Sequence, residues 1–361
     1  MKKNSLNIIL SLLAIVIFTM RAHADYSYSN AVVSLNPVAY WPLDETNAPP
    51  AAYLATNSGY LGAQADGYYN NAYYADGTGY DLKTLFTGPV AGVTSDGDAA
   101  AQFNGGANND DNSGYVLIPD ANHVLDNVPA AFTAEAWVMP EGGDPNDPTG
   151  NSYASTEWAG IIKKGGGGTY YTENGDASGN TYGWTVAMAG KYVLGAPVGW
   201  YGGTPYTGPL QLETNACWVV DLYNGGNGNS PSLEFDVPLN EPAPQWFHLV
   251  LAFDGTNASF YVNGALAATT VSGLPQSTNQ IFAPNNFPAS ATGAYQFSTV
   301  NGVGYAPDTV NPMCLGNINE SFSIIEQGYP QANATGFNCQ NFNGAMDEVA
   351  VYTNALAAAT I

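Results

Sequence analysis

Hydrophobic and polar residues alternate over short runs in this chain, and the clearest runs lie in its last third. An Asp-Gly pair follows the first of these runs, residues 247–253, and an Asn-Gly pair follows the second, residues 258–262. Asp-Gly and Asn-Gly supply the positive φ angles of tight hairpin turns, and the β-branched and aromatic residues beside them favour strands. The segment therefore predicts a β-meander of three consecutive antiparallel strands.

Similar apolar runs, separated by Gly, Pro, Asn and Asp clusters, continue along the chain, and no helical period persists for more than about two turns. Further strands are expected at residues 39–43, 99–103, 115–118, 132–138, 160–163, 183–187, 218–222 and 344–352. Long loops rich in Tyr, Gly and Asn are expected at residues 51–80, 141–157, 193–213 and 278–313. Short strands of this kind are typical of an antiparallel two-sheet sandwich or jelly roll. We therefore predict an all-β fold with long loop insertions.

The N-terminus has the features of a secretory signal peptide. A Lys pair follows Met1, residues 8–20 are apolar, and residues 22–24 form an Ala-His-Ala cleavage pattern. The apolar segment is short for a bilayer span, so a signal peptide is favoured over a membrane anchor. We expect removal of residues 1–24 and a secreted or cell-surface protein. Without a repeat or a long linker, residues 25–361 are expected to form a single domain.

The predicted mature chain is strongly acidic. Removal of the leader takes away Lys2, Lys3 and Arg21, so the formal net charge changes from −23 to −26. Such a surface repels phosphate backbones and anionic lipids, which argues against nucleic acid partners and membrane insertion. Only 10% of the residues are charged, and Asn, Ser, Thr, Gly and Tyr supply much of the polar surface. These groups suit a polysaccharide or cell-surface glycan as partner, although other Gly-rich secreted sandwiches have a similar composition.

The chain has three cysteines, Cys217, Cys314 and Cys339. In an oxidising compartment, a disulfide between Cys314 and Cys339 would close a polar loop and leave Cys217 unpaired. The spacing of the three residues does not resemble a zinc site. The number of cysteines alone leaves open whether this disulfide forms.

Seven segments carry a resemblance to a known fold family. They are PVAYWPLDE (37–45), AAQFNG (100–105), FTAEAWVMP (132–140), IIKKG (161–165), WFHLVLAFDGTNASFYVNG (246–264), LGN (315–317) and FNGAMDEVAVYTNALAAATI (342–361). In this order they resemble a laminin-G-like jelly roll of the concanavalin A-like lectin/glucanase superfamily, in the form common in secreted bacterial proteins. The chain departs from the family in its long insertions. Members usually continue past the equivalent of residues 355–361, so we expect a C-terminal truncation or a lack of further modules.

The resemblance implies two stacked antiparallel sheets with the N- and C-terminal strands adjacent. Asp44 and Glu45 would then approach Asp347 and Glu348. Clustered carboxylates repel one another unless a cation or hydrogen bonds compensate, and calcium takes several oxygen ligands. Related jelly rolls often hold a structural calcium near such a C-terminal Asp, so Asp347 is the predicted ligand and Glu45 its partner. The alternative is that these residues cap strands and face solvent.

Glu234 and Asp236 resemble the start of the E-x-D motif of laminarinase-type members, which cleave β-glucans with carboxylates on one face of a strand. The second catalytic Glu is missing, because Pro238 and Leu239 hold the expected positions. Pro238 also disfavours a central strand. We therefore interpret Glu234 and Asp236 as acids at the edge of a loop and expect a protein that is not an enzyme. A β-glucan-cleaving glycoside hydrolase is the least favoured alternative.

Histidine chemistry gives no better candidate for catalysis. The predicted mature chain contains His123 and His248, and His248 follows Trp246 closely in the meander. A packed or rim histidine is expected there rather than a catalytic base. The sequence also has no G-x-S-x-G elbow and no H-E-x-x-H helix.

Aromatic residues of the inserted loops are the candidate ligand-binding groups. Trp200, Tyr201 and Tyr206 lie among Gly and Pro, and Trp158 lies in another loop. Flat aromatic faces stack on a pyranose while neighbouring polar groups bind its hydroxyls, although packing of the insertions explains these residues equally well. We predict a secreted non-catalytic carbohydrate-binding or adhesive module, stabilised by calcium. The alternative is a structural or interaction domain of a larger surface protein without a sugar site.

Overall fold

The computed structural model describes the two sheets of the protein and part of their connections. The described residues are 27–43, 54–71, 100–103, 114–119, 125, 131–140, 159–165, 183–189, 192–194, 210–212, 217–223, 233–239, 245–271, 313–316, 342 and 344–361. In these ranges, strands are accompanied by the short α-helix α2 (Ser27–Ser34) and the 3-10 helix η1 (Gly62–Ala65). None of the described helices has the length and apolar character needed to cross a bilayer. The prediction of an all-β fold is confirmed.

The first sheet has seven antiparallel strands and contains the predicted meander. Its strand order is β1 (Ala39–Trp41), β17 (Gly344–Tyr352), β6 (Phe132–Pro140), β13 (Phe247–Phe253), β14 (Ala258–Val262) and β15 (Ala265–Thr269), and β4 (Ala101–Phe103) also pairs with β17. Adjacent N- and C-terminal strands were predicted, and β1 indeed pairs with β17.

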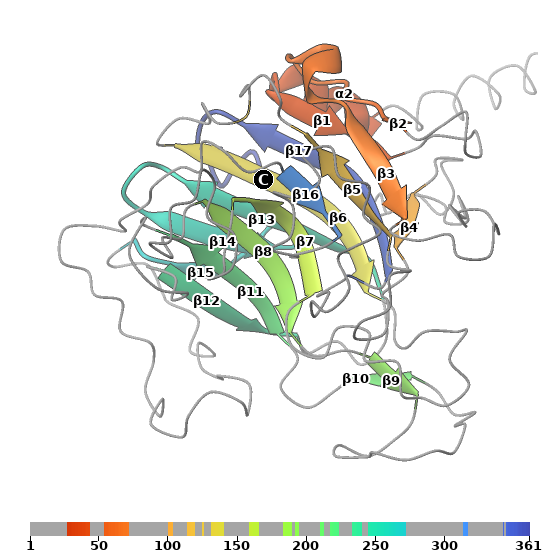
Figure 1. Cartoon of the computed structure of the whole chain (residues 1–361). Helices are drawn as coiled ribbons and strands as arrows, with labels where there is room; N and C mark the ends of the chain where they lie inside the picture. The colour runs from red at the N-terminus through yellow and green to blue at the C-terminus, as the bar shows by residue number, and fades with distance from the viewer. Residues whose placement is uncertain are drawn as a thin grey trace, which may run out of the picture.

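The second sheet has eight antiparallel strands. Its order is β12 (Leu233–Pro238), β11 (Cys217–Leu222), β8 (Trp184–Ala189), β7 (Ala159–Lys164), β16 (Met313–Leu315), β5 (Gly114–Ile118), β3 (Gly67–Asn71) and β2 (Leu54–Ala55). A separate two-stranded ribbon consists of β9 (Tyr192–Leu194) and β10 (Leu210–Leu212). Figure 1 shows the two large sheets as stacked layers, with the ribbon set apart from them.

The hydrophobic core lies between the two sheets, which contribute alternate side chains to it. Phe132 of the first sheet stacks on Trp184 of the second, with 5.2 Å between ring centroids. Trp218 of the second sheet meets Phe247 of the first edge-on at 5.1 Å. Aromatic pairs of this kind stabilise a fold by about 0.5–1.5 kcal/mol each beyond the burial of their area. These contacts hold the sandwich together across its mid-plane.

Both predicted turns of the meander have the expected chemistry. Asn263 and Gly264 have φ angles of 52° and 74°, and a two-residue type I′ hairpin needs positive values at both positions. In the preceding connection, the Asp254 side chain accepts hydrogen bonds from the backbone N–H groups of Thr256 and Asn257. As a result, β13 and β14 have the bounds that the hydrophobic pattern predicts.

Helix α2 covers part of the outer face of the first sheet and was not predicted. Its Val32 packs in a small apolar cluster with Tyr40 of β1 and with Ala350 and Tyr352 of β17. The helix has eight residues, about two turns, so its hydrophobic period is too short to recognise in the sequence. The first described segment of the chain therefore covers the outer face of this sheet near β1 and β17 (Figure 1).

Replacement of Gly183 by Ala is expected to disturb the junction of β7 and β8. Gly183 has a φ of +88°, and a Cβ atom there would lie 1.9 Å from the backbone oxygen of Lys164. The strained φ alone costs roughly 1–2 kcal/mol, and the backbone must also move to relieve the clash. We expect the free energy of unfolding to fall by at least about 2 kcal/mol in urea titrations.

Gly62→Ala is the matched control for this substitution. Gly62 also has a positive φ, +52°, but no atom lies within 4 Å of the position of its Cβ. It therefore carries the backbone cost alone, about 1 kcal/mol. Equal losses in the two variants would contradict the close approach of Gly183 to β7.

Candidate functional site

Acidic side chains gather on the outer face of the second sheet, where β11 and β12 form one edge. The residues on either side of Asp221 in β11, and of Glu234 in β12, belong to the hydrophobic core. Because successive side chains of a strand point to opposite faces, Asp221, Glu234 and Asp236 project from the outer face. We call these three residues the carboxylate cluster.

The strand register brings the three carboxylates together. Asp221 lies directly opposite Glu234, and Val219 lies opposite Asp236, in the antiparallel pair of β11 and β12. Directly opposed residues have Cβ atoms about 4.5–5.5 Å apart. Asp236 follows two residues after Glu234 and therefore shares its face. The register thus places Asp221 and Glu234 side by side, with Asp236 next to Glu234 along the same face.

The interpretation of Glu234 and Asp236 as acids at a loop edge is wrong. Both lie within β12, which is paired with β11 over its whole length. Pro238 is the last residue of this strand, and the strand is at the edge of its sheet, where proline is tolerated. The argument from Pro238 assumed a central strand.

The cluster is buried but has few hydrogen-bond donors. The exposed fraction is 3% for Asp221 and 9% for Glu234, whereas Asp236 keeps partial exposure. The hydroxyl of Tyr223 donates to Asp221 Oδ2 at 3.3 Å. Within the described part of the chain, Asp221 Oδ1, Glu234 Oε1 and Asp236 Oδ1 are buried without a hydrogen-bond partner. Each buried acceptor without a donor costs roughly 1–3 kcal/mol.

Burial and mutual repulsion favour the protonated forms of these acids. Burial raises the pKa of Glu234 to about 7, and the charge of Asp236 adds to this effect. Burial also raises the pKa of Asp236, to about 6. The pKa of Asp221 is raised by burial first and then by the charges of Glu234 and Asp236. The cluster therefore retains protons at pH values where exposed carboxyl groups are ionised.

The nearest described cation in register with the cluster is Lys163. Lys163 of β7 lies opposite Thr185 of β8, which in turn lies opposite Asp221. Two strand spacings separate the Lys163 and Asp221 backbones by about 10 Å. The positive charge of Lys163 lowers the pKa of Asp221, but this effect is smaller than those of burial, of Glu234 and Asp236, and of the Tyr223 hydroxyl.

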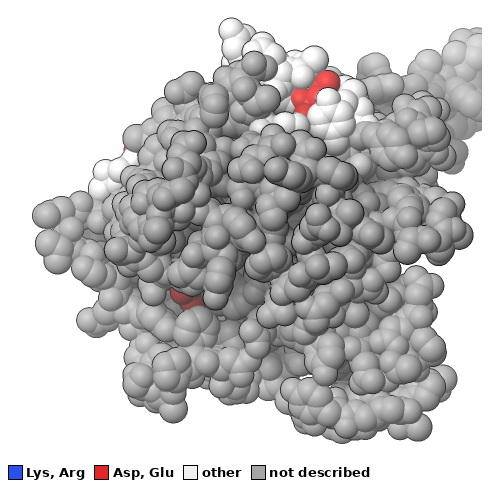
Figure 2. All heavy atoms as spheres, in the orientation of Figure 1, with Lys and Arg blue, Asp and Glu red and all other residues white. Residues whose placement is uncertain are grey.

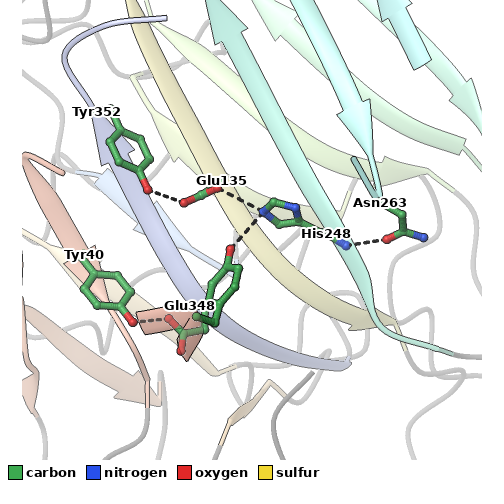
Figure 3. Close-up of polar contacts among 7 residues, drawn as sticks. Tyr40, Glu135, His248, Asn263, Glu348 and Tyr352 are labelled. Atoms are coloured by element: carbon green, nitrogen blue, oxygen red, sulfur yellow. Dashed lines mark hydrogen bonds and ion pairs between the residues drawn. The ribbon is translucent and has the colours of Figure 1, made fainter. Parts of the chain in front are cut away.

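A second polar cluster lies on the outer face of the first sheet and includes Tyr28 and Ser29 of α2. Figure 3 shows the contacts of Glu135, His248 and Glu348 in this cluster. We call it the helix-covered cluster, and it consists of Tyr28, Ser29, Tyr40, Glu135, His248, Glu348 and Tyr352. Glu135 accepts a hydrogen bond from the Tyr352 hydroxyl and lies 3.1 Å from His248 Nε2. Glu348 accepts hydrogen bonds from the hydroxyls of Ser29 and Tyr40. Its acids are thus satisfied by neighbouring side chains.

The surroundings of His248 confirm the expected packed histidine. Its ring stacks on Trp137 with 5.0 Å between centroids, and its Nε2 lies 3.2 Å from the hydroxyl of Tyr28. The pKa values of Tyr40 and Tyr352 are raised by burial and by the adjacent glutamates, so both hydroxyls stay protonated and donate. A closed network of this kind orders the structure but leaves no group available to a ligand.

The predicted calcium ligand Asp347 lies beside this network and is fully buried. Its Oδ1 accepts a hydrogen bond from the backbone N–H of Glu348 at 2.9 Å, and that N–H also lies 3.4 Å from the oxygen of Pro42. Pro42 therefore lies beside Glu348, but Asp44 and Glu45 are outside the described residues. Among the described residues, no three His, Cys, Asp or Glu side chains are arranged to hold a metal. The calcium site stays a prediction.

Most of the other predicted site residues lie outside the part of the chain that the structure describes. Trp158, Trp200, Tyr201 and Tyr206 all lie outside the described residues. Cys314 is buried in β16, but Cys339 lies outside the described ranges, so the disulfide also stays a prediction.

Two aromatic residues are exposed in the described part of the chain, Tyr60 at 79% and Tyr68 at 48%. Because Tyr69 points into the core, Tyr68 lies on the same outer face as the carboxylate cluster. The sequence analysis assigned both tyrosines to a loop and missed β3. Figure 2 shows the molecule as spheres in the orientation of Figure 1, with only small acidic areas and no basic area coloured on this side.

Comparisons with known proteins find likeness in structure only. No protein-family model and no curated protein sequence matches the chain. Domain 4 of the extracellular GH43 arabinanase of Geobacillus stearothermophilus, solved with arabinotriose, is 16% identical with a TM-score of 0.39, and the match covers 90% of this chain and 96% of that domain.

Two further structures show a similar degree of likeness. The binding domain of botulinum neurotoxin DC, solved with SialylT, is 11% identical with a TM-score of 0.41, and the match covers 90% of this chain and 50% of that chain. A pentraxin of Limulus polyphemus is 12% identical with a TM-score of 0.32, and the match covers 63% of this chain and 66% of that chain. At these scores the fold assignment rests on the strand pairing described above, which is the jelly-roll sandwich that the resemblance predicts.

Glu234→Gln is expected to stabilise the fold at high pH. The pKa of Glu234 rises from 4.5 to about 7 on folding, so the folded protein binds more protons than the unfolded one between these values. Stability therefore falls as the pH rises through this window. Removal of the ionisable group should raise the free energy of unfolding by roughly 1–3 kcal/mol near pH 8 and by much less near pH 4. Urea titrations at the two pH values measure this difference.

Glu135→Gln should have the opposite effect, because Glu135 belongs to the satisfied helix-covered cluster. Its substitution breaks the buried pair with His248 and leaves the imidazole without its acidic partner. We expect a loss of roughly 1.5–3 kcal/mol near pH 8, because hydrogen bonds to the Glu135 carboxylate are weakened. The same sign of change in both glutamine variants would contradict the distinction between the two clusters.

Proposed function

We propose that this protein is a secreted, non-catalytic carbohydrate-binding module that holds its ligand at the carboxylate cluster. The supporting observation is the presence of buried carboxylate oxygens for which the described residues offer no donor. Sugar hydroxyls are hydrogen-bond donors, and a carboxyl group accepts hydrogen bonds whether it is ionised or protonated. A bound glycan would supply the missing donors.

A ligand would approach the cluster from the edge of the second sheet. β12 is the outermost strand, and Asp236 keeps partial exposure there. A sugar that enters at Asp236 would reach Glu234 and then Asp221 along the same face. The predicted aromatic residues Trp158, Trp200, Tyr201 and Tyr206 would add stacking surfaces if their loops approach this edge.

A glycan array tests this proposal. The predicted mature chain should be retained on at least one polysaccharide or cell-surface glycan, and the double variant Asp221→Asn, Glu234→Gln should lose at least about tenfold in affinity, since each charge-assisted hydrogen bond contributes roughly 1.5–3 kcal/mol. Asp254→Asn is the control, because it removes one negative charge from an exposed turn and keeps an acceptor oxygen for Thr256 and Asn257.

The outcomes separate the proposal from its alternative. If the folded protein binds no glycan on the array, a structural or interaction domain without a sugar site is favoured. The same array with a chelator tests the proposed structural calcium at Asp347 and Glu45, whose removal should lower thermal stability and weaken retention. An unchanged melting temperature would argue against that calcium.

A glycoside hydrolase is the second candidate, and one observation favours it. Asp221 and Glu234 are directly opposed, and burial raises the pKa of Glu234 to about 7, near the value that suits a general acid at neutral pH. Release of reducing sugar from a β-glucan by the wild-type chain, and its loss in Glu234→Gln, would support this candidate. Retention without release supports the binding module.

A further inference from the structure

We propose that the loop of residues 56–66, which connects β2 to β3, carries a second sugar-contact surface, where the ring of Tyr60 stacks on a pyranose of a neutral glycan. The inference rests on the proposed carbohydrate-binding function and adds a contact surface to it. It is carried by an aromatic side chain that is 79% exposed on a loop held in place by hydrogen bonds. We call the following exposed residues the Tyr60 platform: Val33, Asn36, Ser58, Tyr60 and Gln64.

The loop is fixed by the hydrogen bonds of a buried asparagine. Asn57 Oδ1 accepts hydrogen bonds from the backbone N–H groups of Tyr40 and Gly59. Its Nδ2 donates to the backbone oxygen of Gly62, and its own backbone N–H donates to Asp66 Oδ1. These bonds join the two ends of the loop to each other and to β1.

The tip of the loop lies directly against β1 and the residues before it. The backbone N–H of Tyr60 donates to the oxygen of Pro37 at 2.9 Å. A Cβ atom at Gly59 would lie 2.7 Å from the Cα atom of Ala39, so the two backbones are in close contact. Leu61 packs against the core between the sheets, which holds the exposed Tyr60 beside it. The backbone of Tyr60 is therefore ordered before a ligand arrives, and this lowers the entropic cost of binding.

Neutral polar side chains surround Tyr60. Asn36 directly precedes Pro37, so its backbone is close to that of Tyr60, and its side chain is exposed. Ser58 and Gln64 of the same loop are exposed as well. Amide and hydroxyl groups donate hydrogen bonds to sugar hydroxyls and accept hydrogen bonds from them.

The Tyr60 platform carries no charged residue. Asp66, the acid of the loop, is partly buried and accepts the backbone N–H of Asn57. Figure 2 shows the described surface at this end of the molecule, where Figure 1 places α2, β1 and β2, as mostly neutral with a small acidic area. An aromatic ring among neutral hydrogen-bonding groups matches the apolar face and the hydroxyls of an uncharged sugar. We therefore assign a neutral glycan to the platform.

A protein is the competing partner, and the composition of the surface does not favour it. A standard protein interface buries about 800 Å² on each side around an apolar centre. Among the described residues, the exposed large hydrophobic side chains are Val33, Tyr60 and Tyr68, and Tyr68 lies on the outer face of the second sheet. Two such side chains are few for the centre of a protein interface, whereas a single ring is enough to stack on a pyranose.

The test measures the affinity of the predicted mature chain for cellohexaose, xylohexaose and mannohexaose by calorimetry. The wild type should bind at least one of these neutral hexasaccharides, and Tyr60→Ala should weaken this binding by at least about fivefold, since the aromatic contact is lost. Tyr60→Phe keeps the ring and should stay within about twofold of the wild type. Tyr68→Ala is the matched control, because it removes an exposed tyrosine outside the platform and should leave the affinity unchanged.

Two further measurements show whether the loss of affinity comes from the ring itself. Because Tyr60 is exposed, the midpoint of urea unfolding should be the same in Tyr60→Ala and in the wild type. The aromatic NMR signals that are missing in Tyr60→Ala should also shift when the hexasaccharide is added to the wild type. Signals that do not move at saturating ligand would overturn the platform.

The outcomes separate the platform from the function on which it rests. If Tyr60→Ala binds as the wild type does and the double variant Asp221→Asn, Glu234→Gln does not bind, the platform is overturned and the carboxylate cluster is kept. The reverse pattern keeps the platform and overturns the cluster as the sugar site. Equal losses in Tyr60→Ala and Tyr68→Ala would overturn a specific role of the loop. A folded wild type that binds none of the hexasaccharides and no glycan of the array would overturn both proposals.

Discussion

The antiparallel register of β11 against β12 holds Asp221 directly across from Glu234, and it does so because the residues on either side of both acids are buried in the core. A shift of this register by one residue would turn the acids inward and the apolar residues outward, at a large cost in burial. The packing of the sandwich therefore keeps the like charges together. Mutual repulsion cannot separate them without breaking the sheet, so compensation has to come from protons or from a ligand.

Glu135 and Glu348 of the first sheet find more hydrogen-bond donors than the carboxylate cluster of the second sheet does. On the first sheet, Glu135 and Glu348 are surrounded by tyrosine and serine hydroxyls and by His248, and the helix α2 supplies part of these donors. On the second sheet, the described residues supply one phenol hydroxyl for three acids. A fully satisfied network rigidifies a structure, whereas each buried acceptor without a donor is costly and calls for a specific explanation.

Much of the fold follows from the sequence, because alternation of side chains and turn chemistry are local properties. The Asn263-Gly264 hairpin and the bounds of β13, β14 and β17 were predictable for this reason. Strand β3 (GYYNN) lies in a Tyr, Gly and Asn-rich segment whose composition indicates a loop, and the two-turn helix α2 is too short for a helical period to emerge. Two of the three acids of the carboxylate cluster were predictable, because the E-x-D pattern marks Glu234 and Asp236. The position of Asp221 beside them depends on the pairing of β11 with β12, which the sequence pattern does not reveal.

The most direct test of this account is a carbon-detected NMR titration of the side-chain carboxyl groups in the folded protein without ligand. The account predicts that Glu234 titrates with a pKa of about 7 and Asp236 with a pKa of about 6, while Asp254 titrates below its ordinary value of 3.8 because backbone donors stabilise its charge. Ordinary pKa values for Glu234 and Asp236, near 4, would show that the cluster is solvated or already compensated. That result would contradict the central claim that the second sheet presents a buried, unsatisfied acidic site.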